Sequence, residues 1–243
     1  MCNEEIIEAL VEGILNPETY GLAPEATPRA TLAVHTCLTD PVCSCSTCST
    51  DLESVVCRQT LTRIVEVAVL SSPLVKSEIH GWKHWLSVYR NAVVLAETGS
   101  LHTFPVDLSD EGVSPDLDLT AVIILFAMFH DCRRHDEGYD VTHGIYGAEA
   151  LWSLVGDVLP EATDEIGAAM FACAAHTVVD RPKFDPAWSA TIHERKLAAG
   201  ICLDADRMDL IRLGIMPDPS YLSNGDTTLE AFHNLKSMGA WSL

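Results

Sequence analysis

The sequence is poor in basic residues. It has 15 Lys and Arg against 35 Asp and Glu in 243 residues, which gives a formal net charge of −20. A chain with this balance repels polyanions, and no run of Lys or Arg offers a local exception. We therefore expect no extended nucleic-acid surface. The apolar stretch at residues 119–129 is too short to cross a bilayer, which argues against a membrane partner.

The sequence also lacks the signs of secretion. Residues 1–15 are acidic and have neither the basic start nor the small-residue cleavage pattern of a signal peptide. The nine cysteines are an odd number, and without a secretion signal they are expected to be reduced thiols rather than a disulfide framework. These features predict a cytoplasmic protein.

Strand patterns are absent as well. No alternating β-branched segments bounded by turns occur, and no internal repeat is present. Apolar residues instead recur at helical spacing, and the 48% of hydrophobic residues can form a sizeable core. The pattern predicts an all-α protein, with an N-terminal helix and an irregular Cys-rich extension in residues 1–50 and a helical domain in 51–243. The expected helices cover about 3–15, 51–70, 77–97, 118–131, 141–156, 160–177, 188–213 and 227–236.

Four cysteines crowd the predicted extension: Cys37, Cys43, Cys45 and Cys48. Four thiolates in one short loop could enclose a Zn ion or an iron-sulfur cluster. Their spacing lacks the second CxxC half of a zinc ribbon, however, so a disordered redox-active segment is an alternative. A reversible disulfide between Cys43 and Cys48 is another.

Histidines and aspartates lie at the ends of the apolar helices. The run "LTAVIILFAM" leads directly into "FHD", so His130 and Asp131 are expected to point inward. An ionised aspartate in a core costs several kcal/mol unless a partner compensates it, and a bound cation is one such partner. A single inward histidine is usually a satisfied core residue, but several imidazoles and carboxylates together favour a metal site. The predicted ligands are His84, His130, Asp131, His143, His176 and Asp206.

This order of residues resembles a known signature. His84, the pair His130-Asp131 and Asp206 are similar to the H…HD…D pattern of the HD-domain metal-dependent phosphohydrolases. With His143 and His176 added, the set resembles the H…HD…H…H…D variant of the dinuclear members. The resemblance covers about residues 75 to 215. It implies an HD-domain helical bundle in which Asp131 bridges two ions where two are present.

The donor types suggest the metal and the reaction. Imidazole and carboxylate donors without thiolate suit Mn, Fe, Co, Ni or Zn, and Mg less well, with one or two ions bound. Such an ion lowers the pKa of its water and polarises a phosphoryl oxygen. We therefore expect a metal-bound hydroxide to hydrolyse a phosphoester bond in a small phosphorylated metabolite or nucleotide. The alternatives are a di-iron HD-type oxygenase, because some six-ligand members cleave C–C or C–P bonds with O2, and a non-catalytic metal-containing ligand-binding protein.

Basic residues near the motif are candidates for substrate binding. Arg134, in "HDCRR", lies where related sequences have a phosphate-binding Lys or Arg, and its guanidinium could hold a phosphate bidentately. The alternative is a surface arginine that pairs with Asp136 or Glu137. Lys83 is a weaker candidate for the phosphate, and Arg207 is expected to pair internally.

Two ligand assignments stay open. His80 and His84 stand four residues apart, on the same face of a predicted helix, which is also the spacing of a chelating pair. The resemblance favours His84 as the ligand, with His80 at the pocket wall as a substrate-binding residue. In "DADRMD", which offers Asp204, Asp206 and Asp209, the likeness to the family's ADxL segment favours Asp206.

The motif also departs from the family. Three residues after the histidine of the HD pair, the nucleotidase branch has a general-base Glu, whereas this chain has Arg133. A metal hydroxide would then act without a protein base.

Overall fold

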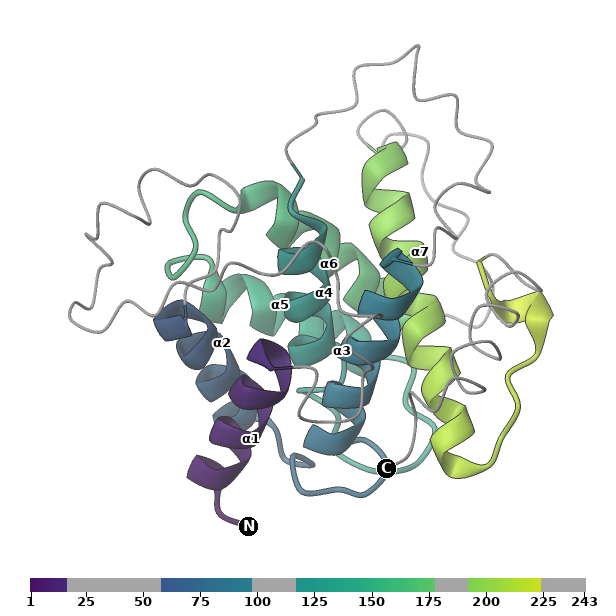
Figure 1. The fold of residues 1–243 in the computed structure, drawn as a ribbon, viewed down its shortest axis with the longest axis horizontal. Coiled ribbons are helices and arrows are strands. Elements are labelled where there is room, and N and C mark those ends of the chain that lie inside the picture. The colour runs from purple at the N-terminus through teal and green to yellow at the C-terminus, as the bar shows by residue number, and fades with distance from the viewer. Residues whose placement is uncertain (17–57, 98–116, 178–191, 224–243) are drawn as a thin grey trace.

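The computed structural model describes residues 1–16, 58–97, 117–177 and 192–223 (Figure 1). These residues form α-helices and two short 3-10 helices and contain no strand, so the all-α prediction is confirmed for the described part of the chain. The predicted helix at 227–236 and the predicted domain boundary at residue 50 lie outside it. The helices are α1 (Asn3–Leu15), α2 (Arg58–Ser71), α3 (Trp82–Glu97), α4 (Leu119–Phe129), α5 (His143–Val155), α6 (Thr163–His176), α7 (Ile192–Met208), η5 (Asp209–Leu213) and η6 (Pro219–Tyr221).

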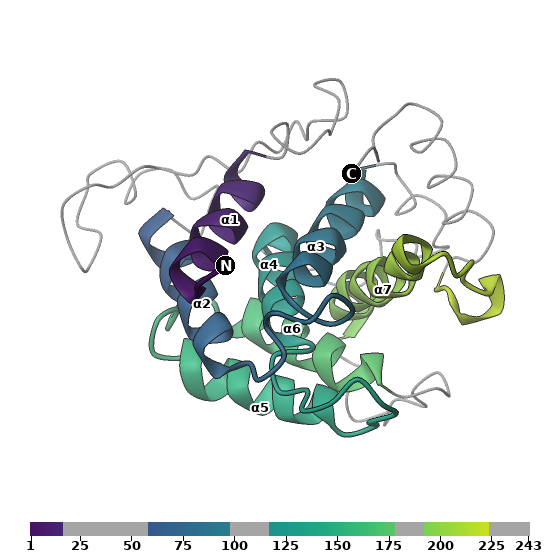
Figure 2. The ribbon, with the colours of Figure 1, turned by 90° about the horizontal axis from the view of Figure 1, so that it is seen from below.

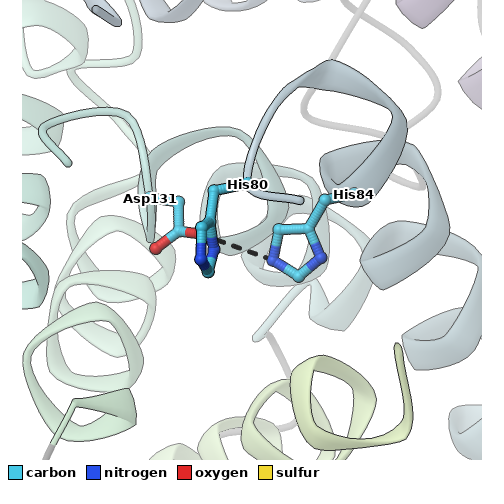
Figure 3. A group of neighbouring side chains, drawn as sticks. All are labelled: His80, His84 and Asp131. Atoms are coloured by element: carbon cyan, nitrogen blue, oxygen red, sulfur yellow. Dashed lines mark hydrogen bonds and ion pairs between the residues drawn. The ribbon is translucent and has the colours of Figure 1, made fainter. Parts of the chain in front are cut away.

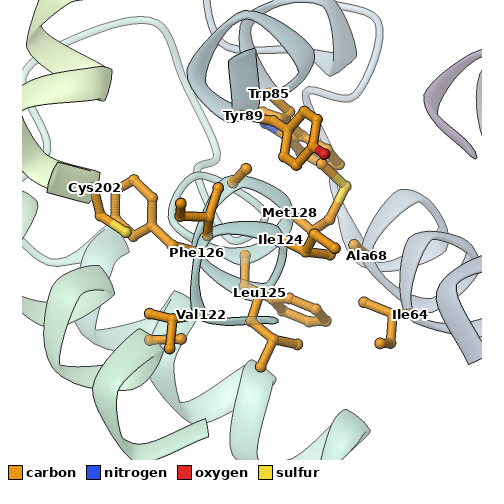
Figure 4. Packing of buried hydrophobic residues seen from close by; sticks show 14 of the residues in the cluster. Ile64, Ala68, Trp85, Tyr89, Val122, Ile124, Leu125, Phe126, Met128 and Cys202 are labelled. Atoms are coloured by element: carbon orange, nitrogen blue, oxygen red, sulfur yellow. The ribbon is translucent and has the colours of Figure 1, made fainter. Parts of the chain in front are cut away.

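Helix α4 is the centre of the molecule. Every residue from 121 to 129 is buried, and a helix that is apolar on all sides must be surrounded by others. Helices α2, α3, α5, α6 and α7 all contact it, as Figure 2 shows. Figure 4 shows side chains of the neighbouring helices around those of α4, among them Ile64, Trp85 and Cys202. The end of α4 is therefore held firmly in place.

The start of α4 is fixed by carboxylates. Asp118 caps the helix by accepting hydrogen bonds from the backbone N–H groups of Thr120 and Ala121, at 2.9 and 3.1 Å. The backbone N–H of Asp118 in turn donates to Glu165 of α6 at 3.0 Å. This contact ties α6 to the same end of α4.

Helix α1 belongs to the same hydrophobic core. Its buried face presents Ile6, Leu10 and Ile14, and it packs against α2 and α3. The hydroxyl of Tyr89 in α3 donates to the backbone carbonyl of Ile14 at 3.3 Å. The first predicted helix is thus confirmed, and it forms part of the main body.

Two glycines allow α5 to approach its neighbours closely. A Cβ atom on Gly144 would clash with the backbone carbonyl of Cys173 and with the ring of His176, both in α6. A Cβ atom on Gly147 would clash with the backbone carbonyl of Phe129 at the end of α4. The sequence "HGIYGA" thus lets the start of α5 meet the ends of α4 and α6.

Helix α3 begins later than the predicted residue 77. Residues 73–80 form turns, and the hydroxyl of Ser77 accepts hydrogen bonds from the backbone N–H groups of Ile79 and His80, both at 3.0 Å. Such local bonds compete with helical hydrogen bonding. The prediction that His80 and His84 share one helix is therefore wrong, because His80 lies in the turn before α3.

The predicted helix at 188–213 also differs from the structure at its C-terminal end. Helix α7 ends at Met208, and the chain continues as the 3-10 helix η5 until Gly214, whose φ of 77° is typical of a helix C-terminus. Among the described helices, none combines the length and the apolar character needed to cross a membrane.

Candidate metal centre

The six predicted ligands come together from five helices. His84 lies in the first turn of α3, His130 and Asp131 follow the last residue of α4, and the others lie at the start of α5 and at the ends of α6 and α7. His84, His130, Asp131 and His143 are buried, and the side chain of His176 is 5% exposed. The residues form overlapping groups whose donor atoms are close enough to hold a metal ion. A buried His/Asp cluster that could bind metal is thus present.

The first group surrounds the Nε2 atom of His84. This atom lies 2.9 Å from Nε2 of His130, 3.3 Å from Oδ1 of Asp206 and 3.5 Å from Oδ2 of Asp131. The Nε2 atom of His130 is 3.7 Å from Oδ1 of Asp206. Three further donor atoms, one from an imidazole and two from carboxylates, therefore lie within 3.5 Å of Nε2 of His84.

The second group surrounds the other oxygen of Asp131. Its Oδ1 lies 2.9 Å from Nε2 of His143 and 3.5 Å from Nε2 of His176, and these two nitrogens are 3.0 Å apart. Donors at about 2.0–2.2 Å from one ion are separated by about 3–3.5 Å, so both groups have suitable spacing. The two carboxylate oxygens of Asp131 face different groups, as a carboxylate that bridges two ions requires.

The other ring nitrogens fix how the imidazoles are protonated. Nδ1 of His130 faces the backbone carbonyls of Phe126 and Ala127 at 3.1 and 3.2 Å, and Nδ1 of His176 faces that of Cys173 at 2.6 Å. Because a carbonyl only accepts hydrogen bonds, each Nδ1 must carry the hydrogen. The lone pair of each Nε2 then points into the site.

The same logic applies to His84, whose Nδ1 lies 2.6 Å from Oδ2 of Asp209. Its Nε2 therefore faces that of His130 at hydrogen-bond distance, and a second such pair joins His143 to His176. Two lone pairs at this distance repel each other unless a proton or a metal cation lies between them. The residues present thus fit a metal ion. A proton competes with the ion for the place between the facing nitrogens.

The pKa values show where that proton resides. Burial lowers the pKa of His84, but hydrogen bonds to Asp206 and Asp209 outweigh it and raise the value to about 10. Burial lowers the pKa of the neighbouring His130 to about 4. Burial would raise the pKa of Asp131, yet His130, His143 and the other histidines around it hold the value well below the ordinary range. In the pair His84–His130 the proton therefore resides on His84, and in the other pair the hydrogen bond to Asp131 outweighs burial and raises the pKa of His176.

Asp209, which bonds Nδ1 of His84, is itself held in place by Arg212. Arg212 donates to Asp209 from Nε at 3.0 Å and from a terminal nitrogen at 2.9 Å. The same guanidinium donates to the backbone carbonyls of Glu78 and Ile79 at 2.7 and 2.8 Å. It therefore joins η5 to the turn that carries His80. The sequence analysis did not identify Arg212; its one signal was the three-residue spacing from Asp209.

Arg134 is buried and reaches the second group. Its Nε donates to the backbone carbonyl of Asp136 at 3.0 Å and a terminal nitrogen donates to that of Gly138, so the alternative of a surface ion pair is wrong. The remaining terminal nitrogen lies 3.1 and 3.2 Å from the two ring nitrogens of His143 and 4.0 Å from Oδ1 of Asp131. Equal distances to both nitrogens place the guanidinium against the ring rather than on one acceptor.

His80 also lies beside Asp131 and forms with it and His84 another group that could hold a metal ion. Figure 3 shows it as a neighbour of His84 and Asp131, and its Nδ1 is 3.0 Å from Oδ2 of Asp131. Its Nε2 lies 3.6 Å from Glu137, and the side chain is 22% exposed. The sequence analysis considered Glu137 only as a partner of Arg134. In the structure Glu137 instead lies beside His80 and accepts a hydrogen bond from the hydroxyl of Ser77.

Other candidates lie away from the ligands. Lys83 pairs with Glu78 at 2.9 Å, is half-exposed and does not line the pocket, so the structure does not bring it to the site. Arg207 lies 3.9 Å from Asp204, as expected, but also lines the pocket. Arg133 faces the backbone carbonyl of Ser71 at 3.4 Å. The possible zinc ligands Cys37, Cys43, Cys45 and Cys48 lie outside the described residues.

A small pocket opens onto the cluster. Its volume is about 210 Å³. Every predicted ligand except His130 lines it, and the wall also includes Arg134, Arg207, Arg212 and the apolar side chains of Ile79, Leu210 and Leu213. Pockets for drug-sized ligands begin at about 300 Å³, so this pocket suits a small molecule or the head of a larger one. Its lining includes three guanidinium groups and the carboxylates of Asp131, Asp206 and Asp209.

Comparison of the chain with protein-family models, curated proteins and solved structures gives no match. The likeness to the HD-domain phosphohydrolases therefore depends on the residues and their geometry. A helical protein with a buried cluster of histidines and aspartates is compatible with an HD-like site.

Proposed function

We propose that this protein is a metal-dependent phosphohydrolase that acts on a small phosphorylated metabolite or nucleotide. The observation that carries the proposal is the position of Asp131, whose two oxygens each meet a pair of facing imidazole nitrogens. Each facing pair of nitrogens needs a proton or a cation between them, and two divalent ions would meet that need at both pairs. The first ion would bind His84, His130, Asp131 and Asp206, and the second would bind Asp131, His143 and His176.

Such ions lower the pKa of water toward neutrality and withdraw electrons from a phosphoryl oxygen. The chain contributes the anion-binding groups. One terminal nitrogen of Arg134 faces the site while the other donors of its guanidinium are held by backbone carbonyls. A phosphate oxygen at this nitrogen gains a charge-assisted hydrogen bond. Arg207 also lines the pocket and would meet another part of an anionic substrate.

His80 is the best-placed proton donor for the leaving group. It lines the pocket, and it contacts Asp131 on one side and Glu137 on the other. In hydrolysis the water oxygen bonds to phosphorus as the ester P–O bond breaks. His80 would donate a proton to the departing oxygen and regain one from the attacking water. A His80→Gln variant should therefore lose most on substrates with poor leaving groups.

The test combines elemental analysis with a panel of nucleotides and phosphoesters. We expect bound divalent transition metal, removable by a chelator, and hydrolysis of at least one phosphoester. The Asp131→Asn variant should lose both the metal and at least about a hundredfold in activity while the helical circular dichroism signal stays. Residues His135 and Asp136 form another His-Asp pair, which is exposed, so Asp136→Asn is the matched control and should retain both.

Two results would overturn the proposal. One is a purified protein that neither contains nor rebinds a transition metal. The other is an Asp131→Asn variant that is as active as the unmodified protein. Bound iron with substrate-dependent uptake of O2, and no hydrolysis of the panel, would instead support a di-iron oxygenase.

A further inference from the structure

The two metal positions differ in the number of donors and in charge. The first has four donor atoms, and Asp206 adds a carboxylate that the second does not share. The second has three donor atoms, and its one carboxylate is the bridging Asp131. Cation affinity increases with the charge and number of ligands. From donor number and charge alone, the second position is expected to bind a metal ion with lower affinity than the first.

The guanidinium of Arg134 places a fixed positive charge beside the second metal position. One terminal nitrogen of Arg134 lies 3.1 Å from Nε2 of His143, which is the atom that faces the ion. An ion bound about 2.1 Å from that Nε2 would lie within about 5 Å of the guanidinium. A guanidinium cannot lose its proton, and in a buried setting like charges at this distance repel strongly.

The guanidinium is not free to withdraw. Its Nε and its other terminal nitrogen donate to the backbone carbonyls of Asp136 and Gly138, and the side chain is 10% exposed. Moving it would leave these buried donors unpaired, which is costly. A phosphoryl dianion between the ion and Arg134 removes the repulsion, because it can bind both cations at once.

From these contacts we propose that Arg134 keeps the second metal position weak in the free protein, and that this position fills together with the anionic substrate. The inference deepens the proposed function, since it rests on a phosphorylated substrate. In addition to its part in substrate binding, Arg134 lowers the affinity of the second position for metal by electrostatic repulsion.

The experiment is a calorimetric titration of the metal-free full chain with Mn²⁺, with and without inorganic phosphate as the probe. The unmodified protein should bind one ion tightly and a second at least about tenfold more weakly, and phosphate should tighten the second at least about tenfold. Arg134→Gln should bind the second ion more tightly without phosphate and should lose the effect of phosphate. Lys83→Gln removes a cation away from the pocket and should behave as the unmodified protein does.

Several outcomes would overturn the inference. They are two ions of equal affinity in the unmodified protein, no effect of phosphate on the second ion, and an Arg134→Gln variant whose second ion binds equally or more weakly. Unchanged affinity for the first ion shows that the variant is folded. If Arg134→Gln does not fold, the phosphate dependence in the unmodified protein decides alone. No hydrolysis is measured, so the inference and the proposed function fail separately.

Discussion

His84 and His130 have opposite protonation states although their Nε2 atoms are 2.9 Å apart. The difference arises because hydrogen bonds to Asp206 and Asp209 outweigh burial and raise the pKa of His84, whereas burial lowers the pKa of His130. His84 bonds the carboxylate of Asp209, which favours the charged ring, whereas His130 bonds two backbone carbonyls and stacks on Phe126. One proton therefore occupies, in the metal-free protein, the place that a metal ion would take.

Metal binding should release this proton. Because the pKa of His84 is raised to about 10, its Nε2 is protonated at neutral pH and must lose the proton to bind an ion. We expect affinity for the first ion to rise with pH, by up to about tenfold per pH unit below that pKa. Calorimetry in buffers of different ionisation enthalpy would measure about one proton released. A pH-independent affinity would show that His84 is not the protonated ligand.

The carboxylate behind His84 should matter for metal affinity. Asp209→Asn keeps the size of the side chain but removes the charge that orients and polarises His84, so the first ion should bind about 10- to 100-fold more weakly. Asp204 is an equally buried aspartate without contact to His84, and Asp204→Asn is the control that should leave metal affinity unchanged. Equal losses in both variants would point to general destabilisation.

The sequence was sufficient to predict which residues lie at the site, but not which residues contact one another there. His130 and Asp131 were predictable because they follow an apolar run that has to be buried. The three aspartates 204, 206 and 209 could not be separated, because their roles depend on the rotation of the chain as α7 passes into η5. The contact from Arg212 to the carbonyls of residues 78 and 79 joins segments more than 130 positions apart, and no local pattern encodes it.

At the scale of elements, the site depends on how closely α5 meets α6. Gly144→Ala should force these helices apart, because the new methyl group would meet the carbonyl of Cys173 and the ring of His176. We expect a loss of about 1–3 kcal/mol in the free energy of unfolding. With phosphate present, the second ion should bind more weakly while the first is retained. Denaturant unfolding and the Mn²⁺ titration would measure these effects.

Glu149→Ala offers the control, since Glu149 is exposed on the same helix. Unchanged stability and metal binding in Gly144→Ala would mean that α5 does not depend on this contact. The element ends themselves were predictable to within a few residues. The start of α3 was wrong because the hydroxyl of Ser77 competes for backbone N–H groups, an effect that apolar spacing does not reveal.

At the scale of the whole molecule, bound metal should stabilise the fold, because the ligands come from five helices that are far apart in the unfolded chain. An ion at about 100 times its dissociation constant adds about 2.7 kcal/mol, which for a chain of this length raises Tm by about 5–10 °C. Thermal unfolding before and after chelation would measure the shift. A Tm that does not respond to the chelator would argue against convergence of the helices on a cation.

This shift should also grow with pH. The pKa of His84 is raised above its unfolded value, so its contribution to metal-free stability is fully present below about pH 6.5 and is lost as the pH rises toward 10. Metal affinity changes in the opposite direction over the same range. Chelated and loaded samples should therefore diverge in Tm as the solution becomes more alkaline.

Helix α4 carries a further consequence. Its residues 121–129 are buried on every side, and His130 and Asp131 follow them without an intervening loop. Inserting one residue into an α-helix turns whatever follows by about 100°. The chain therefore cannot gain or lose a residue in α4 without aiming both side chains elsewhere, which makes the length of this segment as constrained as the identity of the residues after it.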